Sequence, residues 1–308
     1  MWFRNLIVYR CASSLPAAAE IENALAQRPL TPCGGFDLVS RGWIAPAEDG
    51  RLMYTAHGQH LIALGVNQKL LPASIVNQVA RDRADELAAE QGYPVGRRQM
   101  RELKQRIADE LRPRALTRRR VTRAWLDPAN GTLCVDAASA AKAEEVVEVL
   151  RETLGSFPAT RLDTERSPAS VMTSWLMLGD AVGRFAIGEE LELKALDQTR
   201  SVVRYAHHPL DGADVRQHVK AGKAATKLGL TWNDRLAFVL GEKLELKRIE
   251  FLDVRREETT AAEVDAAEQF ELDFVLMAGE LGQMLTDLIA ALGGERSGEA
   301  DERVEAAA

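Results

Sequence analysis

The side chains with the clearest chemical potential are arginines concentrated in one stretch of the chain. Residues 97–123 contain eleven Lys and Arg against three Asp and Glu, a net charge of +8, whereas the whole chain carries −7 and the remainder therefore −15. Arginine suits phosphate because its guanidinium donates two parallel hydrogen bonds. A positive field within an acidic protein can hold a polyanion while the protein stays soluble. The stretch indicates a phosphate-binding surface, and the competing interpretation is a solvated basic face.

The strongest candidates in this stretch are Arg114 and the run Arg118–Arg120, which lie in a loop-to-strand segment with little apolar sequence around it. His207 and His208 follow a predicted strand and could add hydrogen-bond donors to a groove. The sequence has no evident helix-turn-helix or zinc finger to read bases. Any nucleic-acid binding should therefore be directed mostly at the backbone.

A second group of residues indicates a different chemistry. Glu245 and Lys247, with Asp234 eleven residues before Glu245, resemble the acid–x–Lys pattern of metal-dependent nucleases. In those enzymes the carboxylates hold the metal and the lysine supports the attacking water. The competing interpretation is an amphipathic strand that places Glu245 and Lys247 on its solvent face. A third possibility is an interaction scaffold whose basic stretch holds an acidic protein partner.

Other patterns fall short of a site. Gly222–Ala224 ends like a phosphate loop, but Gln217 and Ala224 stand where that motif needs Gly and Ser or Thr. His57 and His60 have no Cys or carboxylate to complete a metal set and are predicted to lie on the surface. The three cysteines are isolated, which favours buried thiols in a reducing compartment. We therefore predict no metal, no cofactor and no catalytic residue.

Length and composition set the class of protein. A chain of 308 residues is long enough for two or three lobes. Its 46% apolar and 28% charged residues are typical of a folded soluble protein. Uninterrupted apolar runs such as Phe274–Ala278 are far shorter than the roughly 20 residues of a membrane helix, and the N-terminus has no signal-peptide pattern. We expect a cytoplasmic protein without a membrane partner.

Hydrophobic periodicity predicts a mixture of strands and helices. Strands are expected at 6–9, 42–44, 60–66, 121–126, 132–136, 191–196, 202–205, 228–232, 236–240 and 244–251. Helices are expected at 15–27, from Ser74 to Gly92, and at 96–111, 140–154, 213–221 and 261–292. The second and third helices form a hairpin, because a short turn with Gly92 and Pro94 joins them. An apolar stripe at Met100, Leu103 and Ile107 leaves the basic residues of the third helix pointing outward.

The last helix carries apolar residues at intervals of three or four, a spacing that suits packing against another helix. From Glu257 onward the chain has fourteen acidic and two basic residues, so the polyanion site is not there. The residues after Gly294 are expected to be disordered.

Six blocks of sequence, in order from Trp2 to about Gly294, resemble the bacterial recombination-associated RdgC family. These blocks are Trp2–Arg10, Thr31–Gly34, Gly42–Pro46, Leu111–Ala115, Ala221–Trp232 and Asp273–Leu281. The resemblance implies a homodimer closed into a ring, with a positively charged hole through which duplex DNA passes. It also implies little sequence preference, antagonism of RecA loading and no enzymatic activity; single-stranded DNA remains a possible ligand. Contacts between helical tips and between base lobes would close the ring.

The family's DNA-contact positions carry over unevenly. Arg114 matches a family arginine. Two positions on, a relative has a phenylalanine at the gate of the ring, where this chain has Leu116 and lacks aromatic stacking. His207 and His208 match a Lys-Gln pair near the gate, and they keep hydrogen-bonding capacity although histidine is mostly uncharged at neutral pH.

Additional cations could compensate for these changes. Arg119 and Arg120 are extra arginines beside the gate, and Lys223 and Lys227, in a matching block, would face the hole. The predicted DNA-binding residues are Arg97, Arg98, Arg101, Arg112, Arg114, Leu116, Arg118, Arg119, Arg120, His207, His208, Lys223 and Lys227.

The combined prediction is an α+β protein with antiparallel sheets, packed helices and a protruding helical hairpin, forming a ring-shaped homodimer. The predicted parts are a central α/β segment (1–73), the hairpin tip (74–112), a second central segment (113–165), a base lobe with a dimerisation helix (166–294) and a disordered acidic tail (295–308). Its predicted partners are double-stranded DNA and a second copy of itself, and its predicted place is the nucleoid in the cytoplasm.

Overall fold

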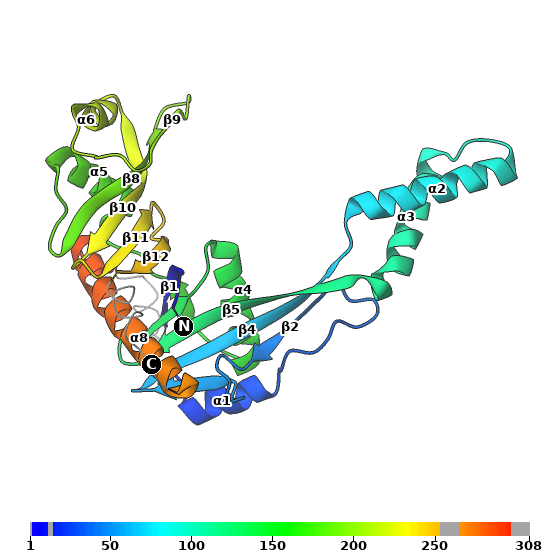
Figure 1. The fold of residues 1–308 in the computed structure, drawn as a ribbon, viewed down its shortest axis with the longest axis horizontal. Coiled ribbons are helices and arrows are strands. Elements are labelled where there is room, and N and C mark those ends of the chain that lie inside the picture. Colours follow the sequence, from blue (N-terminus) through cyan, green and yellow to red (C-terminus); the bar gives the residue numbers. More distant parts are fainter. Residues whose placement is uncertain (1, 12–14, 253–264, 297–308) are drawn as a thin grey trace, which may run out of the picture.

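The computed structural model describes residues 2–11, 15–252 and 265–296 and forms one antiparallel sheet of twelve strands with helices packed on it (Figure 1). The strands are β1 Asn5–Cys11, β2 Val39–Ile44, β3 Met53–Ala56, β4 Gln59–Leu70, β5 Leu116–Asp127, β6 Thr132–Val135, β7 Ala159–Arg161, β8 Phe185–Ala195, β9 Val202–Tyr205, β10 Lys223–Trp232, β11 Leu236–Gly241 and β12 Leu246–Phe251. The helices are α1 Ala18–Ala26, α2 Ala73–Gln91, α3 Arg97–Leu111, the 3-10 helix η1 Arg112–Arg114, α4 Ala140–Leu154, α5 Pro168–Leu178, α6 Ala213–Lys220 and α8 Ala266–Ala291. The predicted α+β class is confirmed.

The molecule is a crescent. A base lobe of β8–β12 with α5 and α6 forms one end, and a long arm carrying the α2–α3 hairpin forms the other (Figure 1). The protruding hairpin is present as predicted, with Ala80, Ala84, Leu103 and Ile107 as its small buried core. The strand order is β2-β4-β5-β6-β1-β12-β11-β10-β8-β9, with β3 on β4 and β7 on β1.

Strand β1 joins the two halves of the sheet. Its first residues pair with β12 (Asn5 with Lys247), and its remainder pairs with β6 on one side and β7 on the other. Successive strand residues point to opposite faces, so Leu6 and Val8 enter the core under α8, whereas Ile7 and Tyr9 enter the core under α1 and α4. One strand thus contributes to both large hydrophobic cores.

Within the described part of the chain, helix α8 packs on the sheet and not on another long helix, which corrects the prediction from its spacing for the single chain. Its predicted role in dimerisation stays a prediction. Trp232 Nε1 donates to Asp287 Oδ2 at 2.8 Å, and the Phe274 ring lies 5.8 Å from that of Tyr54. The buried seam is Phe274, Met277, Leu281, Met284 and Leu288. By length and composition alone, this helix is long and apolar enough to cross a membrane, although its uninterrupted apolar runs are short.

Several elements depart from their predicted bounds. β5 begins five residues before the predicted Val121, and β10 begins at Lys223, so both basic segments are strands. The helix α5 and the short strands β3 and β7 were not predicted. Residues 261–264 of the predicted last helix and residues 297–308 of the predicted tail lie outside the described residues. Glu295, also assigned to the tail, accepts hydrogen bonds from Arg10.

The position of β1 leads to a stability prediction. Leu6 is fully buried beside β12, so Leu6→Ala should lower the free energy of unfolding by about 2–5 kcal/mol through reduced burial and a cavity. Urea unfolding followed by circular dichroism measures this change. Leu272→Ala, on the outer side of α8 where the side chain is 52% exposed, is the control and should change little. Equal effects of the two substitutions would contradict the role of β1 as the joint.

Candidate nucleic-acid interface

The arm is built on the ribbon of β4 and β5. These two strands pair without interruption from Leu70 opposite Leu116 to His60 opposite Leu126. Strand β6 covers the other edge of β5 only from Ala124 to Asp127. Among the described residues, no strand pairs with that edge between positions 116 and 122, and it follows the concave side of the crescent (Figure 1). The basic segment is therefore an edge strand.

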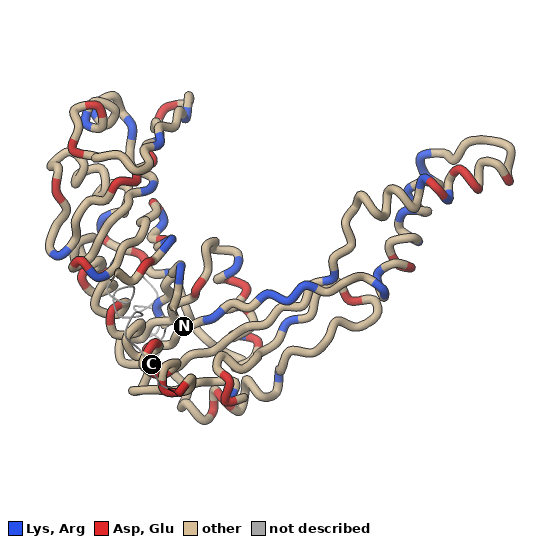
Figure 2. The backbone as a smooth tube through the Cα atoms, viewed as in Figure 1, with Lys and Arg blue, Asp and Glu red and all other residues tan. Residues whose placement is uncertain are grey.

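Alternation along β5 divides its arginines between two faces. Arg118 and Arg120 lie on the face shared with α4, whereas Arg119 and Arg123 lie on the opposite face. The tube in Figure 2 shows a run of Lys and Arg positions along β5. Because the strand is an edge, side chains from both faces can reach a ligand in the concavity. The segment predicted as a loop leading into a strand is thus an edge strand with arginines on both faces.

The β5 arginines differ in how far the protein itself engages them. Arg118 is exposed and contacts no carboxylate among the described residues. Arg119 Nε donates to Asn67 Oδ1 at 3.1 Å, and Arg120 lies 3.9 Å from Glu145. The Nε atoms of Arg120 and Arg123 are buried without a hydrogen-bond partner in the described part of the chain. Unmet buried donors are energetically costly. Because these two atoms are buried, a phosphate in the concavity would reach the exposed guanidinium of Arg118 more readily.

A polar network that sequence reasoning missed fixes the outer edge of the ribbon. Lys69 is 8% exposed, and its Nζ donates to the carbonyls of Gly34 at 2.7 Å and Gly35 at 2.8 Å. Asn67 Nδ2 donates to the carbonyl of Thr31 at 3.1 Å. These bonds satisfy buried polar groups that would otherwise be destabilising. They hold the loop before β2 against β4 and orient Arg119 through Asn67.

At the root of the hairpin, two predicted site residues have different surroundings. Arg112 bonds to Asp109 at 3.0 Å and to the carbonyl of Phe36 at 3.4 Å, so it connects the hairpin to the loop before β2. Arg114 is exposed. Leu116 is 79% exposed at the first position of β5. Arg114 and Leu116 are thus displayed to solvent, whereas Arg112 is engaged within the protein.

The remaining basic residues of the stretch lie toward the tip of the arm. Arg97, Arg98 and Arg101 are exposed on the first turns of α3, and Arg98 pairs with Glu102 at 3.1 Å. A helix of this length spans roughly 22 Å, so these residues are well separated from β5. The basic residues of positions 97–123 are therefore distributed along the whole arm and do not form one patch.

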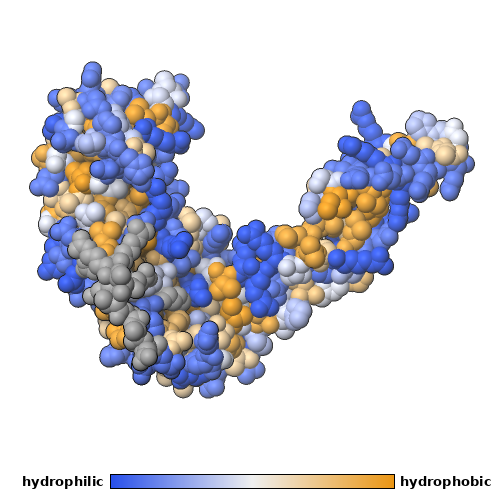
Figure 3. Space-filling view, viewed as in Figure 1, coloured by the Kyte–Doolittle hydropathy of each residue, from blue (hydrophilic) through white to orange (hydrophobic). Residues whose placement is uncertain are grey.

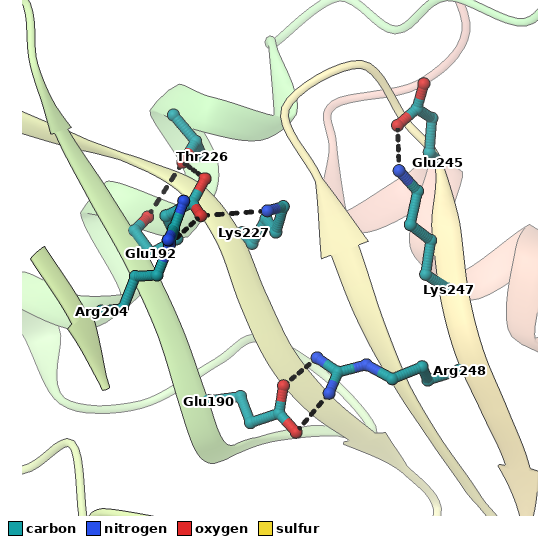
Figure 4. Close-up of polar contacts among 8 residues, drawn as sticks. All are labelled: Glu190, Glu192, Arg204, Thr226, Lys227, Glu245, Lys247 and Arg248. Atoms are coloured by element: carbon teal, nitrogen blue, oxygen red, sulfur yellow. Dashed lines mark hydrogen bonds and ion pairs between the residues drawn. The ribbon is translucent and has the colours of Figure 1, made fainter. Parts of the chain in front are cut away.

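In the base lobe, Lys227 is already paired. Glu192 Oε2 accepts from Lys227 Nζ at 3.0 Å and from Arg204 Nε at 2.7 Å, while Thr226 donates to Oε1 at 2.9 Å (Figure 4). Burial opposes ionisation of this carboxyl, but bonds from Arg204, Lys227 and Thr226 outweigh it and lower the pKa of Glu192 to about 2. Sequence reasoning had no signal for this pairing, because the partners are far apart along the chain.

The other base-lobe candidates lie near strand ends. His207 has a positive φ of 52° in the turn after β9, and His208 donates its backbone N–H to the carbonyl of Glu189 at 3.2 Å. Lys223 is the first residue of β10, beside Ala195 of β8. Both histidines are exposed. The structure thus places these residues on the base lobe, apart from the β5 arginines on the arm.

The geometry contradicts the residue set proposed for the nuclease alternative. Asp234 lies in the β10–β11 turn, whereas Glu245 lies beyond the other end of β11, a strand that spans about 20 Å. Glu245 instead pairs with Lys247 at 2.9 Å and Arg161 at 3.5 Å. Among residues 2–11, 15–252 and 265–296, no three His, Cys, Asp or Glu side chains are grouped to hold a metal ion.

The two histidines considered as metal ligands also differ from expectation. His57 lies in the β3–β4 turn, but His60 is buried, and its Nδ1 lies 2.9 Å from Thr55 Oγ1. Burial lowers the pKa of His60. The prediction of two surface histidines is therefore wrong for His60, which is a packed residue of β4.

Residues 1–295 match the model of a family described as "Putative exonuclease, RdgC". This chain belongs to the RdgC family. It is 48% identical over 299 residues to the recombination-associated protein RdgC of Dechloromonas aromatica, covering 96% of this chain and 98% of the relative. The RdgC proteins of Cupriavidus pinatubonensis and Bordetella pertussis are 44% and 42% identical over 297 residues, covering 96% of this chain and 99% of each relative. The predicted family is confirmed; the relatives' names describe a role in recombination, whereas the family description names an exonuclease.

Proposed function

We propose that this RdgC-family protein binds DNA through its phosphates with little sequence preference. Two copies close into a ring around duplex DNA, and the occupied DNA is less available to RecA. The proposal is carried by one observation, the row of arginines, exposed at Arg118 and Arg119, along the free edge of β5 on the concave side. The relatives' recombination-associated names agree with a role on DNA.

The arrangement favours backbone contact over base reading. An edge strand with arginines on both faces offers donors to phosphates on either side of it. Arg118 on β5 and Arg114 just before the strand are the most available arginines, because both are exposed and Arg118 contacts no carboxylate among the described residues. The acidic remainder of the chain confines DNA contact to surfaces on which Lys and Arg gather.

The shape of the crescent and its exposed apolar side chains support ring closure. The hairpin and the base lobe stand at the two ends of the concavity (Figure 1). Apolar surface is visible on the hairpin and at the root of the arm (Figure 3), and Tyr93 near the tip is 62% exposed. An isolated pair of helices with a small core gains from a partner that covers such surface. In a dimer with a two-fold axis, the hairpin of one copy would contact the hairpin of the other, and the two base lobes would contact each other.

Arg118 provides the direct test of phosphate binding. Affinity for duplex DNA should fall steeply with salt, and Arg118→Ala should flatten the log–log slope by about 0.9 for each phosphate that is no longer neutralised. Fluorescence anisotropy with unrelated labelled duplexes measures both quantities, and the weakening should be similar for every sequence. Arg51→Ala removes the same charge at an Asp49 pair before β3 and serves as the control. Failure of the parent protein to bind at about 50 mM salt would contradict DNA binding and favour an acidic protein partner.

Leu116 tests the gate. Leu116→Phe should restore a stacking surface at the start of β5 and slow the dissociation of DNA several-fold, since stacking on an aromatic ring contributes about 1–3 kcal/mol per base. Stopped-flow dissociation from matched single-stranded and duplex DNA would show which form gains. Leu116→Met, which adds no ring, is the control. Equal rates for all three proteins would place the position away from the DNA.

The mass of the protein in solution tests the proposed homodimer. Sedimentation equilibrium at micromolar concentration should give twice the mass of the 33.9 kDa chain. Tyr93→Asp near the hairpin tip should shift the mass toward one copy, because a charge buried in an interface without a partner is destabilising. Gln78→Asp, at an exposed position of α2, adds the same single negative charge and is the control. A parent protein that sediments as a single copy would contradict the ring.

A further inference from the structure

One face of the base-lobe sheet holds ion pairs that the DNA-binding model leaves unexplained. On β8, Leu191 and Leu193 enter the core shared with α8, so Glu190 and Glu192 project from the opposite face. Each carboxylate engages one or two basic side chains of other strands (Figure 4). Glu192 engages Arg204 of β9 and Lys227 of β10, and Glu190 engages Arg248 of β12. These cations come from distant parts of the sequence and share one face of the sheet.

The pairs are arranged with the cations outermost. The side chains of Arg204 and Lys227 are 74% and 45% exposed, whereas that of Glu192 is 16% exposed. The carboxylate therefore lies beneath the two cations and neutralises only one of their two charges. Within the part of the chain that the structure describes, Arg204 uses only its Nε in this contact, so its terminal nitrogens are available there as donors.

We propose that this face is a second binding site for DNA phosphates, in which Glu192 and Glu190 occupy donors that a phosphate would otherwise take. The inference rests on the proposed DNA binding and adds Arg204, Arg248 and the two carboxylates to it. The carboxylates attenuate the site in two ways. They neutralise part of the cationic charge, and they repel an approaching phosphate. Lys and Arg positions also recur along the side of the base lobe that faces the arm (Figure 2), as a ligand between the two would require.

Exposed ion pairs contribute little net stability, because water solvates the separated groups well. A phosphate can therefore compete for Arg204 and Lys227 without disrupting the fold. The low pKa of Glu192 keeps its carboxylate ionised throughout the neutral range. A mild change of pH will therefore not free the cations from this carboxylate, whereas a substitution that removes its charge will.

The test substitutes Glu192→Gln in the full-length protein. Its affinity for a labelled duplex is measured between about 0.05 and about 0.3 M NaCl, the range in which phosphate contacts dominate. Each protomer that contacts DNA gains one net positive charge, which should steepen the log–log slope by about 0.9 and tighten binding about eightfold at 0.1 M salt for each such protomer. Glu280→Gln removes the same charge from α8, where Glu280 pairs with Arg235 at 2.7 Å, and should change affinity less than about twofold. Arg204→Ala added to Glu192→Gln should abolish most of the gain.

The outcomes separate this inference from the function on which it rests. Unchanged or weaker binding by a folded Glu192→Gln protein, with the parent binding normally, would overturn the inference and leave DNA binding intact. Absence of binding by the parent would overturn both. If Glu192→Gln proves unstable, Glu190→Gln tests the same face through Arg248, with the same expected direction.

Discussion

The structure depends on the sharing of one strand, β1, between two halves of a sheet. Its backbone groups pair with β12 in the base half and with β6 and β7 in the central half, and its side chains enter both large cores. Helix α8 reinforces this joint: the Phe3 backbone N–H lies 3.2 Å from Met277 Sδ, and Tyr54 Oη donates to Glu271 Oε2 at 3.2 Å. A continuous sheet transmits position more firmly than a linker, so the angle between arm and base is fixed by hydrogen bonds and packing.

The two sides of the crescent present positive charge in different states. On the arm, Arg118 is exposed and the Nε atoms of Arg120 and Arg123 lack partners among the described residues. On the base, carboxylates of β8 engage Arg204, Lys227 and Arg248. A chain with a net charge of −7 therefore keeps one strongly cationic edge and one moderated face. The moderated face limits the field that would attract anions indiscriminately.

Elements with their own periodicity and stop signals were predictable from sequence. The predicted bounds of α3 and α4 agree with the observed ones to within one residue, because apolar residues recur at helical spacing. Gly155 ends α4 in a left-handed conformation. The start of β5 was not predictable: both faces are exposed there, so no apolar alternation marks the strand, and pairing with β4 alone defines it. Helix α5 was not predicted because the exposed apolar residues Met177 and Leu178 lie outside its buried face and obscure the helical period.

The candidate site was predictable in composition and not in geometry. Arginine content located the arm, but the division of Arg118 and Arg119 between two faces follows from strand pairing. The Glu192–Lys227 pair joins residues that no local pattern connects. Proximity in sequence was misleading for Asp234 and Glu245, because a hairpin strand places them at opposite ends. Tertiary pairing decides which charges meet, and it leaves little trace in a single sequence.

The combination of an exposed arginine edge and moderated cations suits a protein that holds DNA by enclosure. A closed ring retains its ligand topologically, so the individual contacts do not have to supply a long residence time. Phosphate contacts that are individually weak and salt-sensitive allow movement along the duplex. Strong pairing at every cation would fix the ring in place, whereas contacts shared between carboxylates and phosphates exchange with little change in free energy. On the proposed function, the acidic residues beneath the base-lobe cations are therefore part of the DNA-binding surface and set how readily the ring moves.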